Sequence, residues 1–276
     1  MLAFIKVDEL SIMSAGTIQI SGETLSIVEV ENIKDNLRKH LISLLSLRNC
    51  KLDADGFRKL MRAVCKTKSL LQLNLNIGVV DSDDRAILLA NALNINRSIQ
   101  SLYLHGTPLG DTRFSLMYRA LSLHPSLVDL DVGDCMLGDN GIRMLCYLLA
   151  PDGAKSGLKE LVLSANTRVT NNGWAFFFCS LAASSCLRSL NLDYNPAISD
   201  SGAKMLAVVV AGTRSLKKID LEACNLTEDS AKVWLEMLQS FPTPLRALNI
   251  TENKISTTTM REINECLTHD SSSDDG

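Results

Sequence analysis

Histidine, cysteine and carboxylate side chains are the groups through which this chain could do chemistry, and their spacing decides which kind. The four histidines, which could act as general acids or bases near neutral pH, are His40, His105, His124 and His269. The eight cysteines include no pair with the C-x-x-C spacing of a metal site, and no G-x-x-x-x-G-K-[ST] phosphate loop occurs. The role of the Asp and Glu carboxylates therefore depends on where the fold places them.

A repeat that runs through the chain positions these side chains. Residues 187–195, LRSLNLDYN, read Leu-x-x-Leu-x-Leu-x-x-Asn. The first apolar residue of the pattern recurs every 28 to 31 residues, at Ile42, Leu70, Ile99, Leu127, Leu158, Leu187, Leu216 and Leu245. Such a period is typical of leucine-rich repeats, in which each unit supplies one short strand and one helix. Because strand side chains alternate, the apolar residues at positions four and six are predicted to face one core.

The ninth position of the unit carries a small polar or thiol side chain in all units but one. It is Cys50, Gly78, Thr107, Cys135, Asn166, Asn195, Cys224 and Asn253. We expect these side chains to lie inside the bend and, where they are Asn, to bond otherwise unpaired backbone groups, which Gly78 cannot do. The cysteines here are interpreted as small buried hydrophobes in a reducing compartment, and not as a disulfide framework.

One repeat domain is predicted for residues 17–268, with a degenerate capping unit from Thr17 followed by eight repeats. It is flanked by an N-terminal extension, 1–16, and a disordered acidic tail, 269–276. The longer spacing around residues 150–157 indicates a loop insertion on one rim. Four helices are predicted to begin at a shared glycine, with Asp55, Asn140, Asn172 and Ser201 as their N-caps.

Composition and charge exclude several classes of function. The chain has 28 Lys and Arg against 31 Asp and Glu, with pI about 5.8, which gives no overall bias toward nucleic acid or a membrane surface. No apolar run approaches the ~18 residues of a membrane span. Lys6, Asp8 and Glu9 interrupt the N-terminus where a secretory signal would be apolar. We therefore expect a cytoplasmic protein.

The combination of Leu-x-x-Leu-x-Leu-x-x-Asn/Cys strands with long, glycine-started helices resembles the ribonuclease-inhibitor class of leucine-rich repeats over residues 17–267. The resemblance implies an α/β horseshoe solenoid, with a parallel sheet on the concave face and helices on the convex face. It also implies no enzymatic activity, and binding of a protein partner through the concave sheet. We accordingly predict no cofactor, no metal and no small-molecule substrate.

The concave face of such a stack is formed by positions three, five, seven and eight of each unit. From the capping unit through the third unit these positions contain no acid, whereas the later units contain eight acids against one base, Lys218. The acids are Asp129, Asp131, Asp134, Glu160, Asp193, Asp220, Glu222 and Glu252. Acids in neighbouring units repel each other, which favours a surface that binds a basic partner. Tyr103, His105 and Tyr194 are the candidate anchors.

Two observations suggest other interpretations. Position two reads Lys159, Arg188, Lys217 and Arg246, and this basic rail would neutralise the acids if the two sets paired. His105 and Asp131 fall in neighbouring units, but no nucleophile shares the strand, so we interpret them as a solvated pair and not as a catalytic dyad.

We predict a non-enzymatic scaffold for an unidentified protein partner. The alternatives are a structural component of a large assembly such as the ciliary axoneme, associated with cytoskeleton or cilium, and a GTPase-activating protein like RanGAP.

Overall fold

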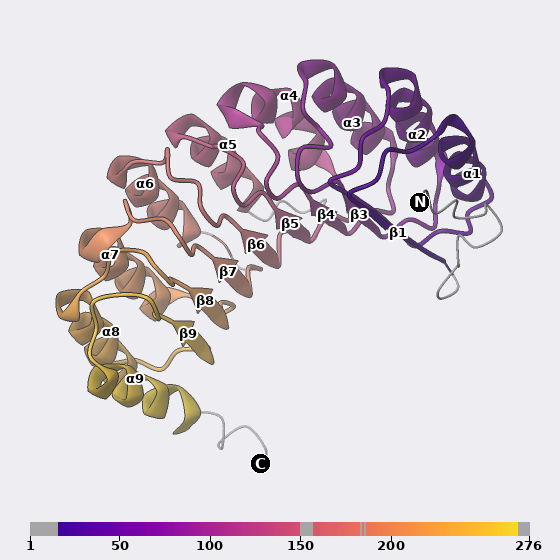
Figure 1. Cartoon of the computed structure of the whole chain (residues 1–276). Helices are drawn as coiled ribbons and strands as arrows, with labels where there is room; N and C mark the ends of the chain where they lie inside the picture. The colour runs from indigo at the N-terminus through magenta and orange to yellow at the C-terminus, as the bar shows by residue number, and fades with distance from the viewer. Residues whose placement is uncertain (1–15, 150–156, 183, 185, 270–276) are drawn as a thin grey trace, which may run out of the picture.

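Residues 16–149, 157–182, 184 and 186–269 are described by the computed structural model, and they form an arc of strand-and-helix units (Figure 1). The strands line the inner, concave side of the arc and the helices cover its outer, convex side. This is the horseshoe solenoid that the repeat predicts. Nearly all of the predicted extension at 1–16, loop insertion at 150–157 and tail at 269–276 lies outside the described residues.

The described part of the chain contains nine strands and nine helices in strict alternation. The strands are β1 (Thr17–Ser21), β2 (Leu44–Arg48), β3 (Gln72–Asn74), β4 (Ser101–Tyr103), β5 (Asp129–Asp131), β6 (Glu160–Val162), β7 (Ser189–Asn191), β8 (Lys218–Asp220) and β9 (Ala247–Asn249). The helices are α1 (Ile27–Arg38), α2 (Ala54–Lys66), α3 (Asp83–Ile95), α4 (Gly110–Leu123), α5 (Asp139–Leu149), α6 (Asn171–Leu181), α7 (Ser199–Gly212), α8 (Glu228–Ser240) and α9 (Thr257–His269). All strands are parallel and pair in chain order.

The register of the sheet follows the repeat. Leu190 pairs with Leu161 on one side and with Ile219 on the other, all at position four of their units. Leu192 and Leu221, at position six, are fully buried between the sheet and the helices. The predicted core face is confirmed. It follows that positions three, five and seven point to the concave side, because side chains alternate along a strand.

The ninth position makes the same hydrogen bond in unit after unit. Asn166 Nδ2 donates to the position-six carbonyl of the preceding unit at 2.9 Å, and Cys224 Sγ does so at 3.2 Å. Five further residues repeat this contact: Cys50, Thr107, Cys135, Asn195 and Asn253. The prediction that the Asn side chains at this position bond the backbone is confirmed, and the cysteines, which were interpreted as small buried hydrophobes, donate to the backbone as well. At Gly78, which has no side chain to donate, the backbone adopts a left-handed φ of +71°.

Carboxylates at the helix starts tie neighbouring units together. Asp111 Oδ1 accepts the backbone N–H groups of Gly138 and Gly141 in the following unit at 2.7 and 3.0 Å. The same bridge runs from Asp139 to Thr170, from Asp200 to Thr227 and from Glu228 to Ser256. These acids hold consecutive units together through backbone N–H groups of the following unit.

The predicted N-cap of α6, Asn172, is wrong. The helix begins at Asn171 and is capped by Thr170, whose side chain accepts the Gly173 N–H. The other glycine-started helices, α2, α5 and α7, also begin before their predicted caps. A Cβ on Gly173 would lie 2.3 Å from Asp139 Oδ1. Glycine is therefore required there by the carboxylate that bridges from the preceding unit, and not by the helix start.

Candidate partner-binding surface

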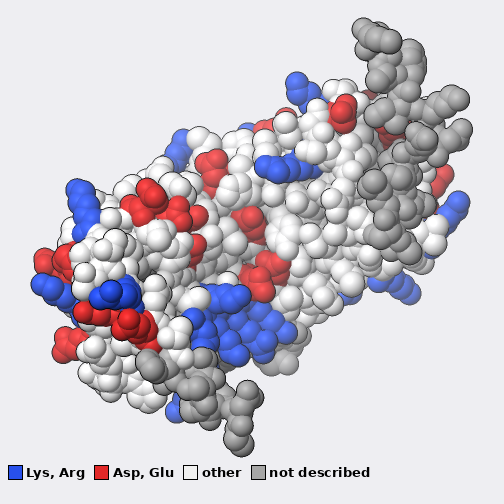
Figure 2. Space-filling view, turned by 60° about the horizontal axis from the view of Figure 1, so that its bottom comes forward, with Lys and Arg blue, Asp and Glu red and all other residues white. Residues whose placement is uncertain are grey.

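The eight predicted acids lie on the concave side of β5 to β9 and on the turns that follow these strands. We call this set the acidic surface: Asp129, Asp131, Asp134, Glu160, Asp193, Asp220, Glu222 and Glu252. Asp129 pairs with Glu160 in the register of the sheet. Figure 2, in which the underside of the arc comes forward, shows acidic side chains gathered there. Neighbouring strands are about 4.8 Å apart, so the like charges of adjacent units repel.

Tyr103 and His105 face the first two acids of this surface. The Tyr103 hydroxyl donates to Asp129 Oδ2, and His105 Nδ1 lies 3.3 Å from Asp131 Oδ1. Partial burial, followed by the contact with Asp129, raises the pKa of Tyr103 to about 12. The hydrogen bond to Asp131 raises the pKa of His105. Partial burial and then the charge of Glu160 raise the pKa of Asp129. Both candidate anchors are thus held by acids of the surface.

A second cluster lies on β7 to β9 and the turns after them. The Tyr194 hydroxyl donates to Glu222 Oε1 at 3.1 Å, and Asn249 Nδ2 donates to Glu222 Oε2 at 3.0 Å. The Asn249 bond and then the Tyr194 bond lower the pKa of Glu222. Partial burial raises the pKa of Asp193, and the charges of Asp220 and Glu222 add to this. The ring of Tyr194 stays half-exposed on the surface.

Three of the four residues of the basic rail form no ion pair with the acidic surface in the described part of the chain. The four residues of the rail lie side by side, because Arg188, Lys217 and Arg246 each donate a backbone N–H to the rail residue of the preceding unit at 2.8 Å. Within the described part of the chain, no ion pair joins Lys159, Arg188 or Lys217 to any of the eight acids. Within the described part of the chain, the one ion pair that an acid of the acidic surface forms is that of Asp131 with His105.

The acids at position five also terminate their strands, which the repeat columns did not predict. Asp131 Oδ1 accepts the Gly133 N–H, and Asp220 Oδ1 accepts the Glu222 N–H, both at 2.9 Å. Three other units make the same turn with an amide in place of the carboxylate: Asn74, Asn191 and Asn249. In these five units the turn uses the side-chain oxygen and not its negative charge. The recurrence of Asp or Asn at position five of the repeat is the sequence signal from which this turn could have been predicted.

The residues at position eight share an unusual backbone conformation. Asp134, Tyr194 and Glu252 have φ values of 48°, 55° and 55°, in the left-handed region. The same holds in the remaining units, at Gly22, Asn49, Ile77, Gly106, Ala165 and Ala223. Because the left-handed φ recurs at position eight whatever residue stands there, it is a feature of the repeat itself, and glycine adopts it without strain. The non-glycine side chains are tolerated at a strained position, where they project from the end of the strand.

The other residues that could do chemistry are not assembled into a site. His124 is buried, and burial lowers its pKa to about 4. Burial raises the pKa of Cys224 to about 12 and also raises that of Cys135, so both thiols stay protonated. The described residues contain no cluster of His, Cys, Asp or Glu that could hold a metal ion. His105 and Asp131 pair as predicted, without a nucleophile hydrogen-bonded to the imidazole.

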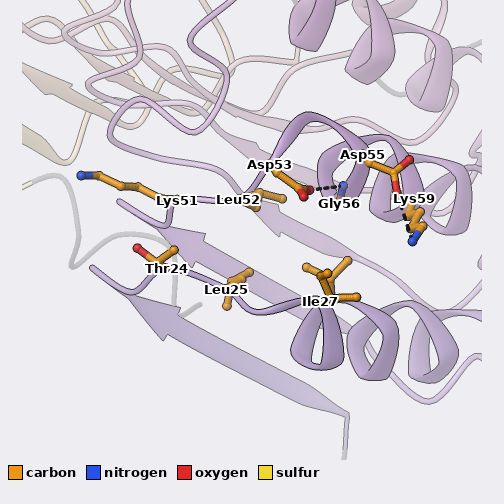
Figure 3. Close-up of a pocket in the computed structure, with 10 residues that line it drawn as sticks. Thr24, Leu25, Ile27, Lys51, Leu52, Asp53, Asp55, Gly56 and Lys59 are labelled. Carbon is orange, nitrogen blue, oxygen red and sulfur yellow. Dashed lines mark hydrogen bonds and ion pairs between the residues drawn. The ribbon is translucent and has the colours of Figure 1, made fainter. Parts of the chain in front are cut away.

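A groove of about 240 Å³ lies between the first two units, where Thr24, Ile27 and Lys51 line it (Figure 3). Three of its charged side chains, Asp53, Asp55 and Lys59, make contacts within the fold. Asp53 Oδ1 caps α2 by accepting the Gly56 N–H at 2.6 Å, and Lys59 pairs with Asp55 and Glu31. Between the next two units the Arg85 guanidinium donates to the Leu52 and Val79 carbonyls and lies over the Phe57 ring. We therefore interpret the groove as part of the packing between adjacent units and not as a binding site.

Comparison with known proteins agrees with this architecture. A Leucine Rich repeat family model matches residues 124–146 and 183–207. Leucine-rich repeat-containing protein 73 of Homo sapiens and that of Rattus norvegicus are each 51% identical to this chain over 255 residues, covering 92% of this chain and 80% of the relative. The chain belongs to the leucine-rich repeat-containing protein 73 family. The similarity extends over nearly the whole solenoid.

More distant relatives share parts of this repeat array. Centrosomal protein of 78 kDa of Homo sapiens is 26% identical over 191 residues, which is 60% of this chain and 27% of that protein. The solved structure of the leucine-rich repeat-containing protein LegL7 from Legionella pneumophila has a TM-score of 0.57 at 19% identity, covering 91% of this chain and 79% of that chain. At such identity the likeness shows the solenoid fold alone.

Proposed function

We propose that this member of the leucine-rich repeat-containing protein 73 family is a non-enzymatic scaffold that binds a basic segment of a partner protein on its acidic surface. The observation that carries the proposal is that eight acids share one concave face, and that none of Lys159, Arg188, Lys217 and Lys218 pairs with them in the described part of the chain. Repulsion among them disfavours the free protein. A cationic partner would relieve it, and would gain speed of association from the same field.

The test removes charge without removing the turns. Asp131, Asp193 and Asp220 are replaced together by Asn, the residue that other units carry at positions five and seven. The probe is a lysine-rich helical peptide of about 20 residues, long enough to be a stable helix. At the modest strength of exposed ion pairs, the loss of three should weaken binding about tenfold in fluorescence anisotropy.

The matched control removes the same amount of charge from the convex side. It replaces Asp84, Glu236 and Glu262, all exposed on helices, by their amides. This control should bind the peptide like the parent chain. Equal weakening by both triple variants would mean that the peptide responds to net charge, and the acidic surface would not be the site.

A second candidate function is a place in a centrosomal or other cytoskeletal assembly. It is favoured by the 26% identity to Centrosomal protein of 78 kDa. Among the described helices, none has the length and apolar character needed to cross a bilayer. A fluorescently tagged chain should then concentrate at centrosomes or at the base of cilia. A uniform distribution through the cytoplasm would argue against this assembly while leaving the binding surface untouched.

The enzymatic alternative, activation of a GTPase as in RanGAP, has a direct test. GTP hydrolysis by candidate small GTPases should be unchanged when this chain is added. Stimulated hydrolysis would contradict the scaffold proposal.

A further inference from the structure

We infer that the basic rail forms the second half of the same binding site, and that the partner segment is an α-helix carrying an acidic stripe beside a basic stripe. The inference rests on the proposed function, because the acidic surface must hold the basic stripe. It adds the chemistry of the partner: a zwitterionic helix, and not a purely basic one.

Where the structure describes it, the rim at which the strands start is positive in its C-terminal half. Among the described residues between the end of each helix and the start of the following strand, from β6 to β9, there is no acid. The same segments contain five bases: Lys159, Arg188, Arg214, Lys217 and Arg246. Lys218 adds a sixth at the start of β8. Figure 2 shows a continuous patch of Lys and Arg beside the acids of the concave side.

The rail is an ordered row of like charges. Backbone hydrogen bonds hold its residues in consecutive units about 4.8 Å apart. Arg188 and Lys217 are exposed, and the described residues offer them no ion pair. Arg246 donates to the Thr243 and Leu245 carbonyls, which fixes its guanidinium near the end of the row. Like charges held this close disfavour the free protein, as they do on the acidic surface, so an anionic group is the complementary occupant.

The distance between the basic rail and the acids is close to the width of one α-helix. The rail occupies position two. Asp220 on β8 occupies position five, and Asp193 and Glu222, on the turns after β7 and β8, occupy position seven, so these acids are separated from the rail by about 10 to 17 Å along the strands. An α-helix with its side chains is about 10 to 12 Å wide. A helix lying across the strands repeats a stripe every ~5 to 6 Å, close to the ~4.8 Å between units. An acidic stripe can therefore follow the rail while a basic stripe follows the acids.

Other anionic occupants fit less well. A nucleic-acid backbone or an anionic membrane presents negative charge over a surface wider than the rail. It would place that charge on the acidic surface as well, within about one Debye length of eight carboxylates. Only a narrow segment with both signs of charge matches both rows at once.

The experiment compares three helical peptides of about 20 residues by fluorescence anisotropy with the full chain. The first carries a Glu stripe beside a Lys stripe, the second has the same composition with the stripes scrambled, and the third carries the Lys stripe alone. We expect the striped peptide to bind about tenfold more tightly than the scrambled one, which corresponds to about three exposed ion pairs on the rail.

Charge reversal of the rail, Arg188→Glu with Lys217→Glu, should abolish the preference for the striped peptide. The control, Arg62→Glu with Lys232→Glu on the convex helices, should retain it. If the Lys-only peptide binds the acidic surface but rail reversal leaves the striped peptide unaffected, the rail inference is overturned and the proposed function stands. If the Lys-only peptide fails to bind, the proposed function fails, and the inference fails with it.

Discussion

Asp131 and Asp220 each combine a turn with a charge, and the structure allows these two roles to be separated. Their Oδ1 atoms accept backbone N–H groups two residues on, as Asn74, Asn191 and Asn249 do in other units. Replacement by Asn keeps the acceptor, whereas replacement by Ala or Lys removes it. Substitutions that change charge and turn together would therefore confuse lost binding with local unfolding.

The imidazole of His105 reports on the charge of Asp131. Its pKa is raised chiefly by the hydrogen bond to that carboxylate. The stabilisation that this contact gives is present below the ordinary histidine pKa of about 6.5 and is lost as pH rises through the raised value. In Asp131→Asn, the pKa of His105 should fall back toward 6.5, as measured by NMR titration. An unchanged titration would mean that other acids set the protonation of His105.

Asp193 should destabilise the free protein at neutral pH. Because its pKa is raised by partial burial and by Asp220 and Glu222, the folded state favours the protonated form. Its contribution is therefore favourable below the ordinary value near 3.8 and becomes unfavourable as pH rises through the raised value. Asp193→Asn, which reproduces Asn76 at position seven, should raise the melting temperature at pH 7 and leave it unchanged near pH 3. A lower melting temperature at pH 7 would show that the carboxylate is a net stabiliser.

At the level of the elements, the strands and the core were predictable and the helix starts were not. The columns of Leu190 and Leu192 fix both register and face, because a shift of one residue would expose every leucine. The N-caps of α2 and α6 are Asp53 and Thr170, each two residues before the predicted cap, because the shared glycine is the third residue of these helices and not the first. In α5 and α6, glycine at the third helical position makes room for a carboxylate 30 and 34 residues earlier, Asp111 beside Gly141 and Asp139 beside Gly173. No local pattern reveals such a long-range contact.

The bridge between α4 and α5 should be sensitive to a single methyl group. A Cβ on Gly141 would lie 2.6 Å from Asp111 Oδ1, so Gly141→Ala must displace the carboxylate from the N–H groups it accepts. We expect a loss of about 1 to 3 kcal/mol in urea unfolding, the cost of leaving such groups unpaired. Gly212→Ala, with open space around it, is the matched control and should be nearly neutral.

The double variant provides the check on this bridge. In an Asp111→Ala background, Gly141→Ala should cost less than in the parent chain, because the clashing carboxylate is gone. Additive losses would mean that the contact with Leu137, which is also close, determines the cost.

The ninth position should show graded losses that follow hydrogen-bonding capacity. Asn166 donates to the Val132 and Leu163 carbonyls and accepts the Leu137 N–H, all while buried. Asn166→Ala leaves these groups unpaired and should cost about 2 to 4 kcal/mol in urea unfolding. Asn166→Cys should cost less, because cysteine makes the contact to the preceding unit at Cys135 and Cys224. Equal losses would contradict the assignment of this position to backbone pairing.

At the scale of the whole molecule, the two charged rows run parallel over the same units. The positions of the eight acids could be predicted from the repeat columns, because the parallel register carries each position across the sheet. Whether the basic rail pairs with these acids could not be predicted from the repeat columns. For the acids at positions five and seven, Asp131, Asp220, Asp193 and Glu222, that depends on their separation from position two, which is three to five residues along the chain. A repeat pattern gives the unit and the position of each residue, but it does not give the distance between the charged groups of two side chains.

Cooperativity along the stack leads to the last prediction. Each unit packs mainly against its two neighbours, so the end units have one neighbour only and should open first. Hydrogen exchange should therefore be faster in α1 and α9 than in α5 and α6. Leu192→Ala removes a fully buried side chain from a middle unit and should cost roughly 2 to 5 kcal/mol. Its effect should appear first as lost protection in α6 and α7, and reach α1 only when the whole stack unfolds. A uniform loss of protection in all units at once would show that the solenoid unfolds as a single cooperative body.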